Sequence, residues 1–252
     1  MADPWEIELQ DSNLKGLKIA DPHYVFRGMT YGQWSGVRWN QVFSAQPDDF
    51  YDEGRGIIFL RGSTGIGHLA EDDPNGRSAQ SSNIYSAQTA QSRLKLPEGT
   101  AVFVPVVSSL FVIGDEYRGA VMKDEIATRF TARTDTVHGG DIWARIKVNF
   151  DGKYRNLVKD LNYFYTESPL FSLRVSERNP FKDKIDVPIK AGNYFGVTVG
   201  ISVIVSYLPP NKTYRLEFGG EGVGGYFSNS VYDIEVIPHK SQLNDISKEN
   251  TS

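Results

Sequence analysis

The stretch that decides the fold is Leu208-Pro209-Pro210-Asn211-Lys212-Thr213-Tyr214, which is followed by the alternating run Arg215-Leu216-Glu217-Phe218. Prolines and an asparagine mark a corner in the chain, and alternating apolar and polar residues indicate a half-buried strand. A tyrosine early in a strand, shortly after a Leu-x-Pro corner, is typical of the tyrosine corner of β-sandwiches, where the phenol bonds to upstream backbone. The stretch therefore predicts a crossing from one sheet to another.

Further strands are predicted on both sides of this corner. Residues 231–236 alternate after a glycine-rich segment, 219–225, which we interpret as a loop. Asp151-Gly152 separates two strand-like runs and predicts a two-residue hairpin turn, because Asp-Gly adopts the positive φ angles of a type I′ turn. Pro105 predicts an edge or a bulge in its own strand. The other predicted strands are 5–9, 56–60, 101–107, 142–150, 153–158, 163–175, 185–189 and 194–206.

Two helices are expected between the strands. Thr30-Tyr31-Gly32-Gln33 fits a capping box, in which the threonine oxygen accepts from the N3 amide and the glutamine reaches back to the cap. We therefore expect a helix over residues 30–45. A second helix, over 116–132, is indicated by apolar residues at a spacing of four, Met122, Ile126 and Phe130. The whole pattern predicts an all-β fold, a single β-sandwich of jelly-roll or immunoglobulin-like kind with two inserted helices.

Composition bounds the class of protein. Of 252 residues, 40% are hydrophobic and 23% charged, which predicts a soluble globular chain with a sizeable core. We assign one domain to residues 24–237, an N-terminal extension to 1–23 and a disordered polar tail to 238–252. A net charge of −4 without a Lys/Arg block argues against nucleic acid as a partner. No transmembrane segment or signal peptide is predicted, and the absence of cysteine excludes disulfides and thiolate chemistry.

Several local motifs occur in a recognisable order. They are Thr30-Tyr31-Gly32-Gln33-Trp34 through Trp39, Phe59-Leu60-Arg61-Gly62, Leu96-Pro97-Glu98-Gly99-Thr100 with the apolar strand 101–106, Asp151-Gly152, Ser168-Pro169-Leu170-Phe171, and Phe218-Gly219-Gly220 with Val231-Tyr232. In this order the chain resembles a group of uncharacterised bacterial and archaeal proteins that often carry a secretion signal. The resemblance covers roughly residues 24–236 and implies an extracytoplasmic location, but it implies no activity. This chain has Arg38-Trp39-Asn40 where the group typically has a denser tryptophan cluster.

The best local acid–base group is Asp135, His138 and Asp141, because a carboxylate beside an imidazole can orient it and raise its pKa. Arg145, Arg61 and His68 are further candidates for an anion-binding group or a base. His138-Gly139-Gly140 is equally consistent with an ordinary loop. An enzyme therefore remains one of the alternatives.

The polar segment 70–92 is interpreted as a long surface loop, of the kind that binds a ligand or moves. Within it, Glu71, Asp72, Asp73 and Asn75 concentrate the oxygen ligands that Ca²⁺ prefers. The alternating register and distal bidentate glutamate of a calcium loop are missing, so a solvated acidic loop is the alternative. No other cofactor is expected.

Aromatic residues in loops offer a binding surface, because tyrosine and phenylalanine rings stack on sugars while neighbouring polar side chains bond the hydroxyls. Four such residues are Tyr85, Tyr117, Tyr226 and Phe227. Trp34, Trp39 and Trp143 are assigned to the core. We therefore expect a non-catalytic binding or surface-associated module with a glycan or protein partner. The alternatives are a hydrolase or lyase that acts on glycans or small molecules through carboxylates and a histidine base, and a subunit that assembles through its sheets.

Overall fold

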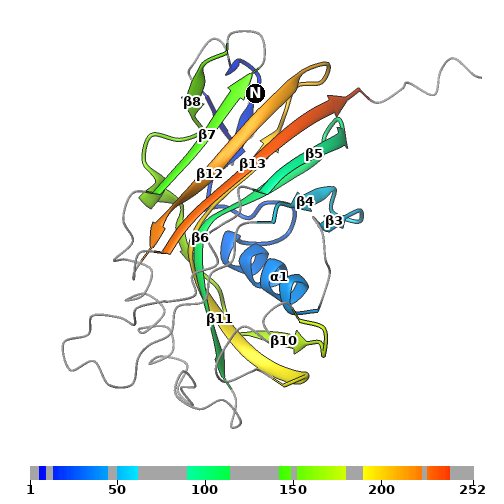
Figure 1. Cartoon of the computed structure of the whole chain (residues 1–252), viewed down its shortest axis with the longest axis vertical. Helices are drawn as coiled ribbons and strands as arrows, with labels where there is room; N and C mark the ends of the chain where they lie inside the picture. The colour runs from blue at the N-terminus through cyan, green and yellow to red at the C-terminus, as the bar shows by residue number, and fades with distance from the viewer. Residues whose placement is uncertain are drawn as a thin grey trace, which may run out of the picture.

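The computed structural model describes residues 6–9, 14–44, 50–61, 90–113, 142–148, 152–179, 190–222 and 226–238, and these residues are mostly β (Figure 1). The larger sheet holds β1 (Glu6–Glu8), β2 (Lys18–Ala20), β3 (Phe50–Asp52), β4 (Ile57–Phe59), β6 (Ala101–Ile113), β9 (Tyr165–Glu167), β10 (Phe171–Val175) and β11 (Gly192–Tyr207). The smaller sheet holds β5 (Ala90–Pro97), β7 (Ile142–Val148), β8 (Tyr154–Asn156), β12 (Thr213–Gly222) and β13 (Tyr226–Ile237). The described helices are α1 (Tyr31–Phe43) and the 3₁₀ turn η2 (Leu161–Phe164).

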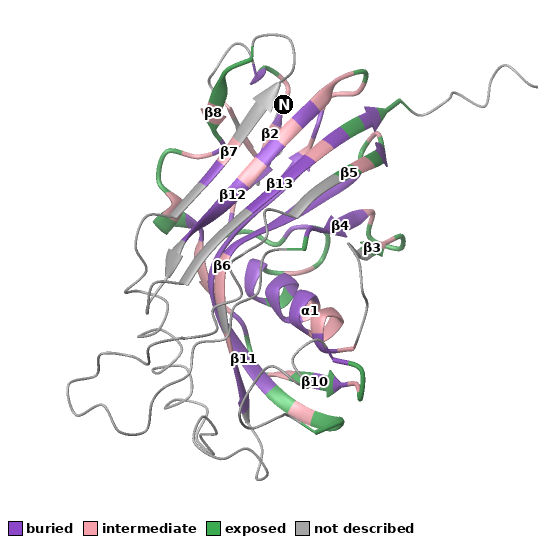
Figure 2. Cartoon of the chain, viewed as in Figure 1, coloured by how far each residue is buried: buried purple, intermediate pink, exposed green. Residues whose placement is uncertain are grey.

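The two sheets share one hydrophobic core. Phe103 of β6 and Val203 of β11 belong to the same buried cluster as Phe218 of β12 and Tyr232 of β13. Figure 2 shows this burial as purple along the inner strands and along α1. An all-β architecture is therefore confirmed in the described part of the chain.

β6 and β11 are long antiparallel strands whose side chains contribute to two buried clusters. Phe103 and Val203 lie in a large buried cluster that also holds residues of the smaller sheet and Trp34 of α1. Val112, near the end of β6, packs instead with Trp39 and Phe43 of α1. In Figure 1 both strands continue past the smaller sheet to the level of α1. The same strands thus contribute to a large core shared with the smaller sheet and α1, and to a smaller cluster with α1 and β10.

A bulge separates these two halves. Ile201 pairs with Val107, whereas the next residue, Ser202, pairs with Pro105, so β6 carries an extra residue at this point. Gly200 has a φ of 155°, and a Cβ there would lie 2.3 Å from the carbonyl oxygen of Val107. The predicted bulge at Pro105 is confirmed, and residue 200 has no room for a side chain.

Helix α1 begins as its sequence predicts. The Gln33 amide donates to Thr30 Oγ1 over 3.3 Å, and the Thr30 amide donates to Gln33 Oε1 over 2.8 Å, which completes the capping box. The helix then lies unusually close to β9, because a Cβ on Gly32 would lie 2.0 Å from the carbonyl oxygen of Glu167. The first predicted helix is confirmed, and the second, over 116–132, lies outside the described residues.

The predicted corner at Leu208-Pro209 is present. Tyr214 is the second residue of β12, it is 2% exposed, and its hydroxyl donates to the carbonyl oxygen of Pro209 over 2.8 Å. β11 ends in the larger sheet and β12 begins in the smaller one, so the corner carries the chain between sheets. The tyrosine-corner interpretation is therefore confirmed.

The predicted hairpin at Asp151-Gly152 has a different register. A two-residue turn there would place Lys147 opposite Asn156, but β7 and β8 pair Lys147 with Tyr154. A shift of two residues leaves every side chain on the same face of the strand, so the hydrophobic pattern does not distinguish the two registers. The prediction of an antiparallel pair was right, and its register was wrong.

The glycine-rich segment also differs from its prediction. Gly219 and Gly220 are buried and lie within β12, paired with β7 on one side and β13 on the other. Ladder bonds on both sides offset the entropy cost of about 0.5–1 kcal/mol that glycine brings to a strand. Residues 90–92, predicted as loop, belong to β5 and pair in parallel with β13.

Residues from the predicted N-terminal extension contribute to the larger sheet. β1 pairs with β2, and β2 pairs with β11, so β1 is an edge strand as the alternation at 5–9 predicts. Leu17 and Ile19 are 1% and 0% exposed. The described N-terminal residues are therefore part of the core.

Candidate functional site

Among the predicted site residues, Arg61 and Arg145 are the ones whose side chains the structure describes. Arg61 is exposed just after β4, and its carbonyl oxygen accepts from the Tyr232 hydroxyl over 2.8 Å. The other described candidate is Arg145. It lies on β7 opposite Glu217, and its guanidinium is 6.0 Å from the ring centre of Tyr154 on β8. Tyr226 and Phe227, predicted in loops, belong to strand β13. The candidates that lie outside the described residues are Asp135, His138, Asp141, His68, Glu71, Asp72, Asp73, Asn75, Tyr85 and Tyr117.

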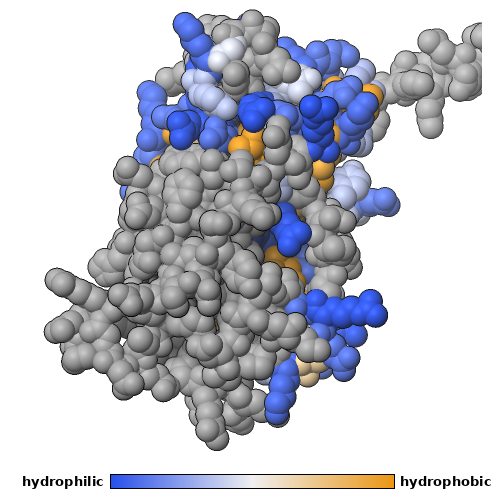
Figure 3. Space-filling view, in the orientation of Figure 1, coloured by the Kyte–Doolittle hydropathy of each residue, from blue (hydrophilic) through white to orange (hydrophobic). Residues whose placement is uncertain are grey.

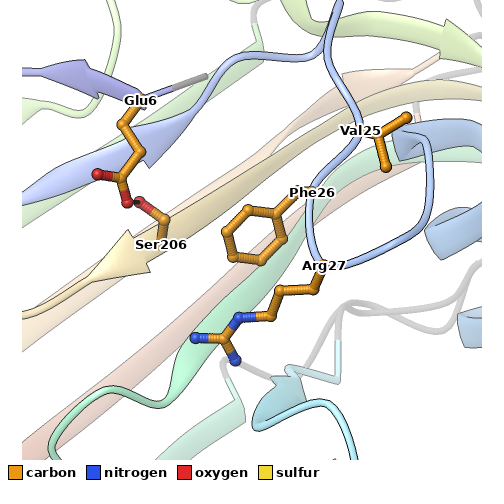
Figure 4. A pocket seen from close by; sticks show the side chains of 5 residues that line it. All are labelled: Glu6, Val25, Phe26, Arg27 and Ser206. Carbon is orange, nitrogen blue, oxygen red and sulfur yellow. Dashed lines mark hydrogen bonds between the residues drawn. The ribbon is translucent and has the colours of Figure 1, made fainter. Parts of the chain in front are cut away.

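A shallow pocket of about 380 Å³ opens beside the N-terminal strands (Figure 4). Its walls are Glu6 of β1, Val25, Phe26 and Arg27 of the loop before α1, and Ser206 of β11. The volume is within the usual range of ligand pockets, about 300–1,000 Å³. The charged groups of this pocket can bind a ligand only where they are not already bonded within the protein.

The Arg27 side chain donates hydrogen bonds to the backbone of two loops. Its guanidinium donates to the carbonyl oxygen of Arg55 over 2.5 Å, to that of Gly56, and to that of Gly99 over 2.8 Å. Partial burial lowers the pKa of Arg27 from its ordinary value. The side chain therefore acts as a clamp that holds the 55–56 and 99 turns together.

The Glu6 carboxylate is likewise bonded to other groups of the protein. Lys18 Nζ lies 2.6 Å from Glu6 Oε2, and Ser206 Oγ donates to Glu6 Oε1 over 2.9 Å. These bonds link β1, β2 and β11, and Figure 4 shows Glu6 and Ser206 directed toward one another. The charged groups of this pocket thus stabilise the sheet edge, which leaves little polar capacity for a ligand.

A second surface lies on the turn before α1 and combines a carboxylate with exposed rings. We call it the Asp21 surface, and it consists of Asp21, His23, Tyr24 and Tyr163. The hydroxyl of Tyr163 lies 3.2 and 3.1 Å from the two carboxylate oxygens of Asp21. The His23 ring meets the Tyr163 ring edge to face at 4.7 Å. Residues 140 positions apart in sequence thus form one patch.

Local geometry explains why these side chains meet. The His23 amide donates to Asp21 Oδ1 over 2.9 Å, and the Tyr24 amide donates to the Asp21 carbonyl over 3.2 Å, which closes a tight turn. On the other segment, Asp160 caps η2 through the Asn162 amide at 2.9 Å. Each turn therefore presents its aromatic residue by a local hydrogen bond to an aspartate.

Buried neighbours hold the surface in place. Phe164, next to Tyr163, is 2% exposed and packs edge to face with it at 5.5 Å, whereas Tyr163 itself is 41% exposed and Tyr24 49%. Desolvation and the hydrogen bond to Asp21 raise the pKa of Tyr163 above its ordinary value. The phenol is consequently protonated at neutral pH and donates to the carboxylate.

The acceptor positions that remain on Asp21 define which ligands the Asp21 surface can bind. An ionised carboxylate has about four acceptor positions, and Asp21 uses part of them for Tyr163 and the His23 amide. The remaining lone pairs and the exposed ring surfaces suit a ligand with both hydroxyl groups and an apolar face. The sequence analysis missed this patch because Tyr163 was placed at the start of a predicted strand. The Asp-Pro-His-Tyr turn was the available signal.

Metal chemistry finds no support within the described residues, since no three histidine or acidic side chains there converge on a common point. None of the described helices has the length and apolar character needed to span a bilayer.

A search of family models, curated proteins and solved structures produced no match to this chain.

Proposed function

We propose that this chain is a non-catalytic binding module that holds a glycan on the Asp21 surface. The observation that carries the proposal is the position of two exposed tyrosines, Tyr24 and Tyr163, beside a carboxylate that a hydrogen bond already orients. Apolar C–H faces of a sugar stack on such rings, and sugar hydroxyls donate to such a carboxylate.

The charge of the surface narrows the glycan class. Asp21 carries the negative charge at its centre, and Asp160 lies at the start of the neighbouring turn. A uronic or sulfated sugar would bring a like charge to Asp21 in partly desolvated surroundings, which is unfavourable. The proposed ligand is therefore a neutral saccharide.

Two broader interpretations support this role. We propose that the two sheets form a sandwich of jelly-roll or immunoglobulin-like kind, an architecture that hosts lectin and adhesion functions among others. The resemblance to bacterial and archaeal proteins with secretion signals favours a location where extracellular glycans occur. Both interpretations are consistent with a surface-associated module.

The test is a glycan array with the purified chain, followed by titration of the best neutral saccharide against Tyr163→Ala. Tyr154→Ala is the matched control, because Tyr154 is 40% exposed but lies on β8 of the other sheet. We expect Tyr163→Ala to weaken binding about tenfold or more, equal to about 1.4 kcal/mol, and Tyr154→Ala to leave it unchanged.

Binding that is equally sensitive to both substitutions would exclude the Asp21 surface as the site. Mass analysis of the saccharide after incubation separates binding from cleavage, because a module that only binds returns the ligand intact. Absence of binding to every neutral saccharide would remove the glycan proposal.

A further inference from the structure

Among the described strands, β5 lies at the edge of the smaller sheet and carries a distinct charge pattern. β5 is the last strand in the order β5-β13-β12-β7-β8, and its described neighbour in the sheet is β13. Figure 1 shows β5 at the margin of this sheet. An edge strand presents backbone N–H and C=O groups that can pair with another extended chain.

Two of the exposed side chains of β5 are basic. Arg93 and Lys95 are both exposed and lie two residues apart, so they project from the same face of the strand. In the parallel register they stand beside Asp233 and Glu235 of β13. Across the sheet, the outer face therefore alternates from acidic on β13 to basic on β5.

One of these cations has no partner among the described residues. Lys95 pairs with Glu235 at 3.2 Å, but Asp233 pairs with Arg215 of β12 at 3.4 Å. Arg93 forms no ion pair or hydrogen bond within the described part of the chain. The alternation of charge across the sheet thus ends in an unpaired positive charge at its margin.

The inner face of the edge is also incomplete. Leu94 is half-buried, whereas Ile234, beside it in the register, is 1% exposed. A further strand would cover Leu94 with an apolar side chain, as β13 already does from the other side. Figure 3 shows that the described surface in this upper part of the molecule is otherwise largely hydrophilic.

The edge is held rigidly at one end. The Thr100 amide donates to the Pro97 carbonyl over 3.1 Å, and the Glu98 amide donates to the Ile237 carbonyl over 2.8 Å. Tyr207 of β11 adds a hydroxyl bond to the Glu98 carboxylate over 2.9 Å. A strand fixed in this way loses little conformational entropy when a partner pairs with it.

We propose that β5 accepts an extended strand of a partner protein in which acidic residues alternate with apolar ones. Opposite-charge pairs across neighbouring strands are stabilising, and like charges directly opposite each other are destabilising. Acidic side chains two residues apart would meet Arg93 and Lys95, and the apolar residues between them would cover Leu94. The occupant is a partner of this charge pattern, and the proposal is independent of the glycan site.

A second copy of this chain is excluded as the occupant by its own charges. In an antiparallel pairing of two β5 strands centred on residue 93, 94 or 95, with the outer faces together, Arg93 or Lys95 of one copy lies directly opposite Arg93 or Lys95 of the other. Two copies would therefore repel each other at this edge.

The test uses a blocked peptide of alternating valine and glutamate, titrated into the full chain by isothermal calorimetry. Two control peptides have lysine in place of glutamate, or N-methyl groups on alternate residues to remove backbone donors. We expect binding of the glutamate peptide alone, slower hydrogen exchange at β5 amides in the complex, and weaker binding at high salt.

Arg93→Gln removes the unpaired cation from an exposed position, and we expect it to weaken binding of the glutamate peptide about twofold to fivefold. Arg93→Glu should weaken it further and should improve binding of the lysine peptide. An unchanged melting temperature confirms that each variant is folded. Equal affinity for the two peptides, protection outside β5, or dimers of the free chain that protect β5 would each overturn the proposal.

Discussion

Two tyrosines hold neighbouring residues of one turn from opposite sides, and their surroundings give them opposite roles. Inside, the Tyr31 hydroxyl donates to the Ala20 carbonyl over 2.5 Å and accepts from the Ile204 amide over 3.1 Å, and Tyr31 is 0% exposed. Outside, the Tyr163 hydroxyl bonds the carboxylate of Asp21 and the residue is 41% exposed. The same phenol therefore fixes the fold in one place and is available to a ligand in the other.

The two tyrosines differ in whether water can replace the hydrogen bond of a removed hydroxyl group. Water cannot reach the partners of Tyr31, so removal of its hydroxyl leaves a buried carbonyl and a buried amide unpaired. Water does reach Asp21, because this residue is itself partly exposed. Desolvation is the main cause of the raised pKa of both phenols, and at Tyr163 the hydrogen bond to Asp21 raises the pKa further.

The largest expected effect comes from the buried side of the turn. Tyr31→Phe should lower the free energy of unfolding by about 3 kcal/mol, because each of two buried partners loses its bond at about 1–3 kcal/mol. Urea denaturation of the variant and the parent measures this difference. A loss below about 1 kcal/mol would show that the two partners find other bonds, and the contrast with Tyr163 would then disappear.

The burial of Tyr31 should also make the free energy of unfolding depend on pH in the alkaline range. Burial raises the pKa of Tyr31 above its ordinary value of 10.0, so the unfolded chain releases this proton first as pH increases. The stabilisation is complete below pH 10 and declines above it, by about 1.4 kcal/mol per pH unit for each such phenol.

Denaturation curves between about pH 8 and pH 11 test this slope, and Tyr31→Phe should reduce it by the contribution of one proton. Tyr214, whose pKa burial also raises, should maintain part of the decline in that variant. A slope that Tyr31→Phe leaves unchanged would contradict the assignment.

The smallest expected effect is on the exposed side. Tyr163→Phe should change the free energy of unfolding by less than about 0.5 kcal/mol, because water replaces the phenol at the Asp21 carboxylate. The ring remains available for stacking, so saccharide affinity should fall less than in Tyr163→Ala. A large loss of stability in Tyr163→Phe would show that the Tyr163 hydroxyl stabilises the fold, as the Tyr31 hydroxyl does.

Sequence patterns predicted the parts of this fold that depend on local chemistry. The capping box at Thr30, the bulge at Pro105 and the corner at Tyr214 each involve side chains bonded within a few residues, or a missing amide, and all three are present. The register of β7 and β8 was not predictable, because two alternatives bury the same face. The strand character of 219–220 was not predictable either, since it depends on distant partners.

The Asp21 surface was beyond sequence reasoning for a related reason. Tyr163 and Asp21 are joined by tertiary contact alone, and alternation marked Tyr163 as a strand residue rather than as part of an exposed turn. The predicted aromatics Tyr85 and Tyr117 lie outside the described residues, and those at 226–227 belong to β13. Composition suggests tyrosine as a candidate binding side chain but cannot choose among thirteen tyrosines.

The link between the first strands and β11 has a consequence for biosynthesis. Glu6 and Ser206, which share a hydrogen bond, are separated by 200 residues, and Tyr31 and Ile204 by 173. A ribosome exposes the N-terminal strands well before their partners are synthesised. Leu17 and Ile19 must therefore remain uncovered during most of translation, so folding completes late and the nascent chain depends on protection from aggregation until β11 emerges.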